Sequence, residues 1–395
     1  MDITITPAKL SGTIHAIPSK SQAHRLLICA AFADKKTTLL CPETNQDIEA
    51  TADCLRSFGA NILWKNGAYI VLPINKLPTK AILHCRESGS TLRFMLPIAG
   101  ALGIDTTFVL EGRLPYRPLS PLWEEMEHHG CTLTRPTETT IQCTGKLTTG
   151  HYSIDGSVSS QFITGLLFAM ALIPGNNSLT ITGKLESKPY IDMTQNALKQ
   201  FGVITENYTV SASCPFTSPE LLSVEGDWSN GAFFIAAKTI GNDVEIQGLD
   251  PTSSQGDRAI NDLAKVLLRD AAIIDAADIP DLVPILAVTA GALNGATFTN
   301  IRRLRLKESD RVASVCEMLS QLGAKTEADE NTLHVYPAKY RSCTIDAVGD
   351  HRIAMAAGIA ATVATGPVTI CGAQCVSKSY PTFWEEYRRI GGQYE

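Results

Sequence analysis

The segment LRLKESDR, residues 304–311, places a side chain that can move protons beside side chains that can hold anions. The carboxyl of Glu308 can donate or accept a proton, and the neighbouring lysine and arginines can bind phosphate or carboxylate groups. A run of charges of both signs is also typical of a solvated loop that leads into a helix, with Ser309 or Asp310 as N-cap. The rest of the chain has to decide between these interpretations.

Hydroxyl and basic side chains gather where apolar, helix-like segments begin. The unpaired N–H groups and partial positive charge of a helix N-terminus attract anions. A single serine there is more often a helix cap, but several helix starts that carry serine together with lysine or arginine favour a site for phosphates or carboxylates. The residues are Lys20, Ser21 and Arg25; Glu87, Ser88, Gly89, Ser90 and Arg93; Ser159, Ser160 and Gln161; Asp281; and Asp350, His351 and Arg352.

Further polar residues lie in connectors that the same site could use. Arg117 lies in the proline-stiffened segment GRLPYRPLSP, and Lys378 precedes the last expected helix. Ser187 and Tyr190 lie in ESKPYIDM. Among these cations the carboxylate of Asp281 is a candidate for a base that works with the acid of the first segment.

The composition of the chain limits its function classes. A net charge of -6 and a pI near 5.8 argue against a general nucleic-acid binder and favour small anionic ligands for the clustered cations. No segment is apolar for the length of a membrane span, and the N-terminus MDITITPAKL lacks the regions of a secretion signal. Eleven cysteines without CxxC pairs predict reduced thiols in a cytoplasm and argue against a zinc site.

A repeat organises the chain. Six times an apolar, alanine-rich segment typical of a buried helix is followed by a short β-type run and then by an amphipathic helix candidate, at a spacing of roughly 50–70 residues. The buried segments begin near Lys20, Gly89, Ser159, Gly226, Ile279 and Gly349. Most amphipathic segments stop at a glycine, as a helix C-cap prefers: Gly59, Gly130, Gly202, Gly323 and Gly391.

Six buried helices need more than one hydrophobic core. Two groups of three, giving two similar α/β domains with a cleft between them, are the simplest arrangement. An array of repeats that offers only a binding surface is the alternative, and it would not need acid and base residues.

Ten motifs, taken together and in order, resemble a known family. They are PSKSQAHR, ESGSTLRFM, YRPL, SSQF, SKPYID, EGDWSNGAFF, IPDL, RLKESDR, GDHRIAMA and SKSYPTF. Nearly from end to end, the chain resembles the 5-enolpyruvylshikimate-3-phosphate synthases (3-phosphoshikimate 1-carboxyvinyltransferases) of the enolpyruvyl transferase family.

The resemblance implies an α/β fold of two similar domains, each made of three βαβαββ repeats around buried helices, an inside-out α/β barrel. The chain would cross between the domains twice. Residues 17–224 would form the N-terminal domain on the shikimate 3-phosphate side, and residues 1–14 with 226–395 the C-terminal domain. The active site would lie in the cleft between them.

The implied reaction transfers the enolpyruvyl group of phosphoenolpyruvate to the 5-hydroxyl of shikimate 3-phosphate, on the route to chorismate and the aromatic amino acids. It releases phosphate and needs no metal or organic cofactor. A base takes the hydroxyl proton, an acid protonates the methylene carbon so that C2 becomes electrophilic, and a tetrahedral adduct collapses by expelling phosphate. We expect a cytoplasmic monomer that binds neither nucleic acid nor membrane. In this family glyphosate competes with phosphoenolpyruvate, so the resemblance makes the chain a glyphosate target whose sensitivity the sequence leaves open.

The site roles are carried over from the matching motifs. By resemblance Asp281 is the base, Glu308 the proton donor and acceptor at the methylene carbon, and Lys20 a contact to both ligands that assists proton transfer. The expected phosphoenolpyruvate-binding residues are Lys20, Gly89, Arg117, Gln161, Arg311, Arg352 and Lys378. The expected shikimate 3-phosphate-binding residues are Lys20, Ser21, Arg25, Ser159, Ser160, Gln161, Ser187, Tyr190, Asp281 and Lys307. Asp47 and His351 are secondary candidates.

Three positions depart from the family pattern. Pro18 stands where many relatives have glycine, and Arg303 where some have an asparagine that contacts shikimate. Glu87 stands where many relatives have asparagine, and its charge lies near the expected anion site. Its side chain therefore either points away or pairs with Lys20 or an arginine. These changes leave the catalytic set intact and bear on ligand affinity and glyphosate sensitivity.

Three rival functions remain to be weighed. A UDP-N-acetylglucosamine enolpyruvyl transferase typically carries a reactive cysteine before the arginine that matches Arg117, whereas this loop, GRLPYRP, has none. A non-catalytic anion-binding relative is expected to lack Lys20, Asp281 or Glu308, and all three are present. An RNA-end-processing enzyme with related repeats is disfavoured by the negative net charge.

Overall fold

The computed structural model describes residues 1–211 and 215–395. The chain divides into two compact units, of which one is Pro18–Val224 and the other combines Met1–Ile17 with Glu225–Glu395. We call them the middle unit and the terminal unit. Each has its own hydrophobic core.

Three apolar helices form the centre of each unit. They are α1 (Lys20–Ala31), α3 (Gly89–Leu102) and α5 (Ser160–Leu172) in the middle unit, and α7 (Trp228–Thr239), α9 (Val283–Ala292) and α11 (His351–Ala361) in the terminal unit. Nearly every side chain of α5 and α9 is buried, which explains why their sequences lack a polar face. The six predicted buried helices are confirmed.

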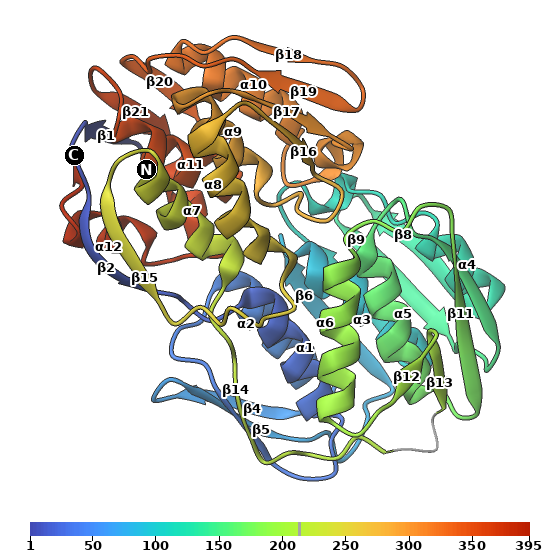
Figure 1. Cartoon of the computed structure of the whole chain (residues 1–395). Helices are drawn as coiled ribbons and strands as arrows, with labels where there is room; N and C mark the ends of the chain where they lie inside the picture. Colours follow the sequence, from blue (N-terminus) through green and yellow to red (C-terminus); the bar gives the residue numbers. More distant parts are fainter. Residues whose placement is uncertain (212–214) are drawn as a thin grey trace. The chain divides into compact units, whose positions relative to one another are not determined.

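Six amphipathic helices cover these centres. They are α2 (Gln46–Ser57), α4 (Leu122–His128), α6 (Lys188–Gln200), α8 (Ile260–Arg269), α10 (Arg311–Leu322) and α12 (Phe383–Arg389). Figure 1 shows α3, α5 and α6 side by side in the middle unit, where α5 packs against both neighbours. The predicted terminal glycines all have positive φ, for example +94° at Gly323. None of the helices in the described ranges is both long and apolar enough to cross a membrane.

Five of the six sheets in the described residues have four strands, with one parallel pair extended by antiparallel strands. The middle unit has β14 (Leu221–Ser223), β3 (Thr37–Leu40), β5 (Ala68–Leu72) and β4 (Asn61–Lys65); β6 (Lys80–Arg86), β7 (Asp105–Leu110), β9 (Thr140–Gly145) and β8 (Cys131–Thr137); and β10 (His151–Asp155), β11 (Asn176–Thr182), β13 (Thr209–Ser211) and β12 (Thr205–Glu206). The terminal unit has β16 (Ala272–Asp275), β17 (Ala296–Thr299), β19 (Thr332–Val335) and β18 (Thr326–Ala328); and β20 (Cys343–Asp346), β21 (Val368–Cys371), β1 (Ile3–Thr6) and β22 (Gln393–Tyr394).

The fourth repeat differs from the expected βαβαββ pattern. Its sheet, as described, has only β15 (Asp243–Gln247) and β2 (Ser11–His15). Asp270 and Ala271 alone separate α8 from β16, which already belongs to the next sheet, so the chain has no length for a hairpin there. Because β1 and β2 pair with β21 and β15, the first seventeen residues belong to the terminal unit.

Candidate active site

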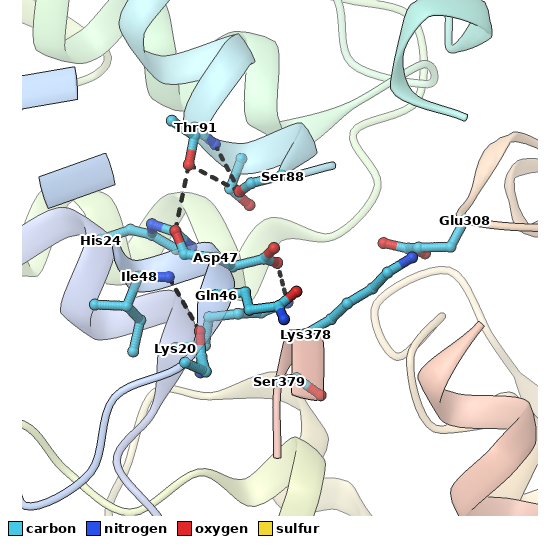
Figure 2. Close-up of polar contacts among 12 residues, drawn as sticks. Lys20, His24, Gln46, Asp47, Ile48, Ser88, Thr91, Glu308, Lys378 and Ser379 are labelled. Carbon is cyan, nitrogen blue, oxygen red and sulfur yellow. Dashed lines mark hydrogen bonds and ion pairs between the residues drawn. The ribbon is translucent and has the colours of Figure 1, made fainter. Parts of the chain in front are cut away.

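Lys20 is the first residue of α1 and forms an ion pair within the middle unit. Ser19 caps this helix by accepting the N–H of Gln22 at 3.4 Å. The Lys20 Nζ atom lies 2.8 Å from Oδ2 of Asp47 in the first turn of α2 (Figure 2). Lys20 is the residue expected to contact both ligands, and Asp47 is a secondary candidate. The structure therefore pairs two residues that were predicted for the site.

Gly89 begins α3 and lies against two arginines. A Cβ atom at this position would be 2.6 Å from Nη1 of Arg117 and 3.1 Å from Nη1 of Arg93, so only glycine fits without displacing them. Arg93 donates to Oε1 of Gln161 at 2.6 Å and to the carbonyl of Pro118 at 3.1 Å. Gly89, Arg117 and Gln161 are thus brought together as expected, and Arg93, to which the motifs assigned no ligand role, links them.

Glu87 extends over the loop that carries Arg117. A Cβ atom on Gly112 would lie 2.6 Å from Oε2 of Glu87, and Gly112 has φ +54°. Both the left-handed backbone and the carboxyl group exclude a side chain at this position. Glu87, which stands where many relatives have asparagine, therefore places its carboxyl group against Gly112, at the start of the loop that carries Arg117.

Arg25 is buried and donates to several protein acceptors. Its guanidinium bonds the carbonyls of Ser21 at 2.6 Å and Tyr190 at 2.9 Å, and the hydroxyl of Thr194 at 2.8 Å. Burial lowers the pKa of Arg25 to about 10, which leaves it protonated at neutral pH. These bonds hold α1 against α6, and the predicted phosphate contact of Arg25 stays a prediction.

Of the four serines predicted to bind shikimate 3-phosphate, Ser21 is the second residue of α1, and the other three lie at the starts of α5 and α6. Ser159 caps α5 by accepting the N–H of Gln161 at 3.3 Å, so the capping interpretation holds for this hydroxyl. Ser160 is the first residue of α5 and is buried. Ser187 precedes α6 with φ +56° and is also buried. A strained backbone of this kind at a residue other than glycine is common at functional sites.

Arg311 forms the centre of an ionic cluster in the terminal unit. Its side chain is completely buried, and it donates to Asp350 at 3.0 Å, to Asp281 at 2.8 Å and to Glu308 at 2.6 Å. Burial by itself lowers the pKa of the guanidinium, but Asp350, Glu308 and Asp281 raise it above its ordinary value. One predicted ligand-binding residue thus holds both candidate proton carriers.

Asp281 accepts from three cations. Besides Arg311, Oδ2 lies 3.2 Å from Nη2 of Arg352 and Oδ1 lies 3.4 Å from Nζ of Lys307. Burial lowers the pKa of Lys307 to about 8, although Asp281 opposes this shift. Mutual pairing offsets the free energy that it costs to bury these charges.

The start of α11 gathers the remaining predicted residues of this unit. Asp350 caps the helix by accepting the N–H of Arg352 at 3.0 Å. Burial by itself raises the pKa of the Asp350 carboxyl, but Arg311 holds it below its ordinary value. Nζ of Lys378 donates to the carbonyl of Gly349 at 2.9 Å, and His351, the first residue of α11, is buried.

Both interpretations of the segment 304–311 describe part of it. Asp310 is the N-cap of α10 and accepts the N–H of Ala313 at 3.1 Å, and Arg305 lies 3.3 Å from its carboxylate. Ser309 instead donates to Asp350 at 3.1 Å. Along this segment, the residues of the helix cap, Arg305 and Asp310, are thus interspersed with residues that enter the ionic cluster.

Sequence reasoning missed Asp257, a buried acid in the 3₁₀ helix η2 (Gly256–Ala259). Burial and, after it, the nearby Asp281 carboxylate raise the pKa of Asp257 to about 6, against the opposing effect of Arg352. Its signal in the sequence is an aspartate in SSQGD just before an amphipathic helix, and this pattern is indistinguishable from a helix cap. Within residues 1–211 and 215–395, no group of three or more His, Cys, Asp and Glu side chains is arranged to hold a metal ion.

Cations and carboxylates at the starts of buried helices, on two units of helix-centred α/β repeats, define an α/β enzyme for anionic substrates. The family model for EPSP synthase (3-phosphoshikimate 1-carboxyvinyltransferase) matches residues 5–387. The chain belongs to the EPSP synthase family.

Similar proteins agree with this family over their whole length. A 3-phosphoshikimate 1-carboxyvinyltransferase of Clostridium kluyveri is 36% identical over 416 residues, covering 99% of this chain and 97% of the relative. One of Clostridium novyi is 37% identical over 426 residues, covering 99% and 98%. A solved EPSP synthase of Acinetobacter baumannii has a TM-score of 0.81 at 23% identity, covers 100% of this chain and 99% of its own, and shows the shared fold.

The family defines the reaction. Its members transfer the enolpyruvyl group of phosphoenolpyruvate to shikimate 3-phosphate in the shikimate pathway, and the chain is an enzyme of this activity. The predictions of the family, the two-domain α/β fold type and the reaction are confirmed.

Proposed function

We propose that the chain transfers the enolpyruvyl group to the 5-hydroxyl of shikimate 3-phosphate, with Asp281, Glu308 and Lys20 carrying the proton transfers. The observation that carries this proposal is the pairing of the Asp281 carboxylate with three cations at N–O distances of 2.8 to 3.4 Å. A carboxylate among cations can both hold a substrate hydroxyl and release countercharges to substrate anions.

Substrate binding activates Asp281 in this proposal. Both substrates carry phosphate and carboxylate groups, which compete with Asp281 for Arg352 and Lys307. As these cations turn to the substrates, the Asp281 carboxylate loses stabilisation of its charged form and becomes a stronger base. It then accepts the proton of the 5-hydroxyl as the hydroxyl oxygen bonds to C2 of phosphoenolpyruvate.

Glu308 carries the proton at the methylene carbon. Its carboxyl protonates C3, which makes C2 electrophilic for the attacking oxygen. When the tetrahedral adduct collapses, the bond from C2 to the phosphate oxygen breaks, and Glu308 takes a proton back from the methyl group. Figure 2 shows the side chains of Glu308 and Lys378 directed toward each other. We therefore propose that the ammonium group of Lys378 stabilises the negative charge that Glu308 carries after it has given its proton to this carbon.

The ligand contacts divide between the units. We assign phosphoenolpyruvate to Lys20, Gly89, Arg117 and Gln161 of the middle unit and to Arg311, Arg352 and Lys378 of the terminal unit. Shikimate 3-phosphate is assigned to Lys20, Ser21, Arg25, Ser159, Ser160, Gln161, Ser187 and Tyr190, with Asp281 and Lys307. The clustering of these side chains within each unit, described above, supports the assignment.

We propose that the two units are the two domains of this enzyme and that ligand draws them together. The support is that the residues assigned to phosphoenolpyruvate come from both units. X-ray scattering should then show a smaller radius of gyration when shikimate 3-phosphate is added. An unchanged radius at saturating ligand would contradict closure.

We also propose that the enzyme is a cytoplasmic monomer. None of the ten cysteines in the described ranges forms a disulfide, as expected in a reducing compartment. Each unit buries its own apolar helices without a second copy. Sedimentation at several concentrations tests the monomer, and localisation of a tagged chain tests the compartment.

Phosphate release from phosphoenolpyruvate tests the acceptor. One reaction contains shikimate 3-phosphate and the other contains UDP-N-acetylglucosamine. Release only with shikimate 3-phosphate is expected, and product analysis should place the ether at the 5-position. Release only with the nucleotide sugar would overturn the acceptor, and binding of shikimate 3-phosphate without release would favour a non-catalytic relative.

A further inference from the structure

A buried row of hydrogen-bonding side chains connects three helices in the middle unit. His24 on α1, Thr51 on α2 and Thr91 on α3 are all completely buried. Nδ1 of His24 lies 2.7 Å from the hydroxyl of Thr51, which lies 2.8 Å from that of Thr91. The row joins three elements that are far apart in the sequence, and no role in the reaction has yet been given to its members.

The row ends beside two residues of the candidate site. The Thr91 hydroxyl is 2.8 Å from Oγ of Ser88, the N-cap of α3, and 3.5 Å from the backbone carbonyl of Asp47 (Figure 2). Asp47 forms the ion pair with Lys20, and Gly89 follows Ser88. The row therefore terminates directly at the backbone that places Asp47 and Gly89.

Counting protons gives the row a direction. The single hydroxyl proton of Thr91 is donated toward Ser88 and the Asp47 carbonyl, so Thr91 must accept from Thr51. Thr51 has then spent its own proton and must accept from His24. The proton of the neutral His24 ring consequently lies on Nδ1.

The other edge of the His24 ring agrees with this tautomer. Nε2 is buried and has no hydrogen-bond partner among the described residues, and the ring meets Phe94 edge to face at 6.2 Å between centroids. A buried nitrogen without a hydrogen, which can only accept a hydrogen bond, is tolerated without a partner better than a buried N–H group. Burial, with Lys20 and then Arg25, holds the pKa of His24 well below its ordinary value, so the ring is neutral.

We propose that His24, Thr51 and Thr91 are positioning residues, whose directed hydrogen-bond row fixes the starts of α1, α2 and α3 and thereby the Lys20–Asp47 pair and Gly89. The proposal rests on the role in catalysis given above to Lys20. It adds that this part of the site is aligned by neutral groups, so that alignment does not change when the charged substrates bind.

Nitrogen NMR of the full chain, labelled at histidine, tests the direction of the row without any substitution. A neutral His24 ring with its proton on Nδ1 is expected throughout the range of pH in which the enzyme works. A proton on Nε2, or a charged ring at neutral pH, would overturn the proposal. His24→Asn identifies the signal and also keeps an N–H donor near the position of Nδ1.

Kinetics of matched threonine variants test the positioning role. Thr51→Val removes the hydroxyl with little change of shape, and Thr51→Ser restores it. We expect kcat/KM for phosphoenolpyruvate to fall about tenfold in Thr51→Val, as for partners in one hydrogen-bond network, and to recover in Thr51→Ser. His24→Leu should resemble the first variant and His24→Asn the second.

A buried threonine outside the row provides the control. Thr37 on β3 is completely buried and bonds Ser218 at 2.7 Å, so Thr37→Val loses a hydroxyl from the same unit. Equal melting temperatures with lowered kcat/KM only in Thr51→Val support positioning. Equal kcat/KM in both variants would overturn it.

Lys20→Met separates this proposal from the proposed function. If Lys20→Met is inactive while Thr51→Val has ordinary kinetics, the positioning role alone fails. If Lys20→Met turns over normally, the catalytic role of Lys20 fails first, and the tautomer of His24 still reports on the row itself.

Discussion

The middle and terminal units hold their candidate residues by different physical means. In the middle unit the paired side chains of Lys20 and Asp47 lie beside a row of neutral hydrogen bonds that starts at His24. In the terminal unit the buried guanidinium of Arg311 contacts three carboxylates, and Asp281 accepts from three cations. One arrangement is aligned by hydroxyl groups and the other by balanced charge.

This difference shows where substrate charge can act. The terminal cluster contains three cations (Lys307, Arg311 and Arg352) and three carboxylates (Asp281, Glu308 and Asp350), so its formal charges cancel. Buried charges cost several kcal/mol when their partners are removed, so we expect anionic substrates that bind here, as proposed, to rearrange the ion pairs of this cluster. A neutral hydroxyl row has no charge to redistribute and keeps its geometry.

Removal of either proposed proton carrier should have the largest effect. Asp281→Asn and Glu308→Gln keep the shape of the side chain but cannot exchange a proton in the same way. We expect turnover to fall by about 10²–10⁴-fold in each, the usual contribution of general acid–base groups, measured by phosphate release at saturating substrates.

Asp310→Asn is the matched control, because asparagine also caps a helix and Asp310 lies only two residues from Glu308. Its turnover should stay near that of the unmodified chain. A near-normal rate in Glu308→Gln or Asp281→Asn would remove that residue from its role.

Removal of the central cation should destabilise the terminal unit more than any single hydroxyl destabilises the middle unit. Arg311→Met leaves the Asp350 carboxylate buried without its main countercharge. We expect the free energy of unfolding to fall by about 3–5 kcal/mol, measured by urea denaturation at pH 7. Arg302→Met breaks the exposed pair with Glu330 and should change little. Equal effects of the two substitutions would contradict a stabilising cluster.

Asp257 should make the stability of the terminal unit depend on pH. The pKa of Asp257 in the folded chain, about 6, lies above the ordinary 3.8. The stability that depends on protonation of Asp257 is therefore fully present below about pH 4 and is lost as the pH rises through 6. As the pH rises across this range, the free energy of unfolding of Asp257→Asn should therefore increase by about 3 kcal/mol relative to that of the unmodified chain. Urea midpoints from pH 4 to 7 measure the difference, and a constant difference would mean that Asp257 is not buried as an acid.

Lys307 should give the smallest effect, on substrate affinity. Because its pKa is about 8, the ammonium group is lost as the pH rises above 8, and the attraction for shikimate 3-phosphate is lost with it. The KM for this substrate should rise about fivefold from pH 8 to pH 9, since the charged fraction of Lys307 falls from about one half to about one tenth over this unit. Lys307→Arg should remove this rise, because arginine keeps its charge.

Local sequence patterns predicted most of the fold. The six apolar helices were predictable because each is surrounded by core and shows no polar face, and the glycines that end their amphipathic partners have the positive φ that a C-cap needs. The two-stranded fourth sheet was not predictable from the repeat. It follows from the short connection between α8 and β16 and from pairing with β2 at the other end of the chain.

The motifs indicated which residues to consider for the candidate site, but not which of them contact one another. Motifs gave Asp281, Glu308 and Arg311 by resemblance. They did not indicate that Arg311 would hold both of the others, or that Arg93 would bond Gln161. Serine and threonine patterns were ambiguous, because a hydroxyl at a helix start can cap the helix, bind a ligand or do both.

The sequence by itself determined the family, the reaction and, outside the fourth repeat, the order of the secondary structure elements, because these depend on local periodicity and on short motifs that occur along nearly the whole chain. Only the tertiary structure decided which charges neutralise one another and which hydroxyl groups share protons. Asp257, Asp281 and Arg352 come from three separate segments, as do His24, Thr51 and Thr91. Their pKa values and tautomers depend on burial and on neighbours within a few ångströms, which exist only once the helices have packed.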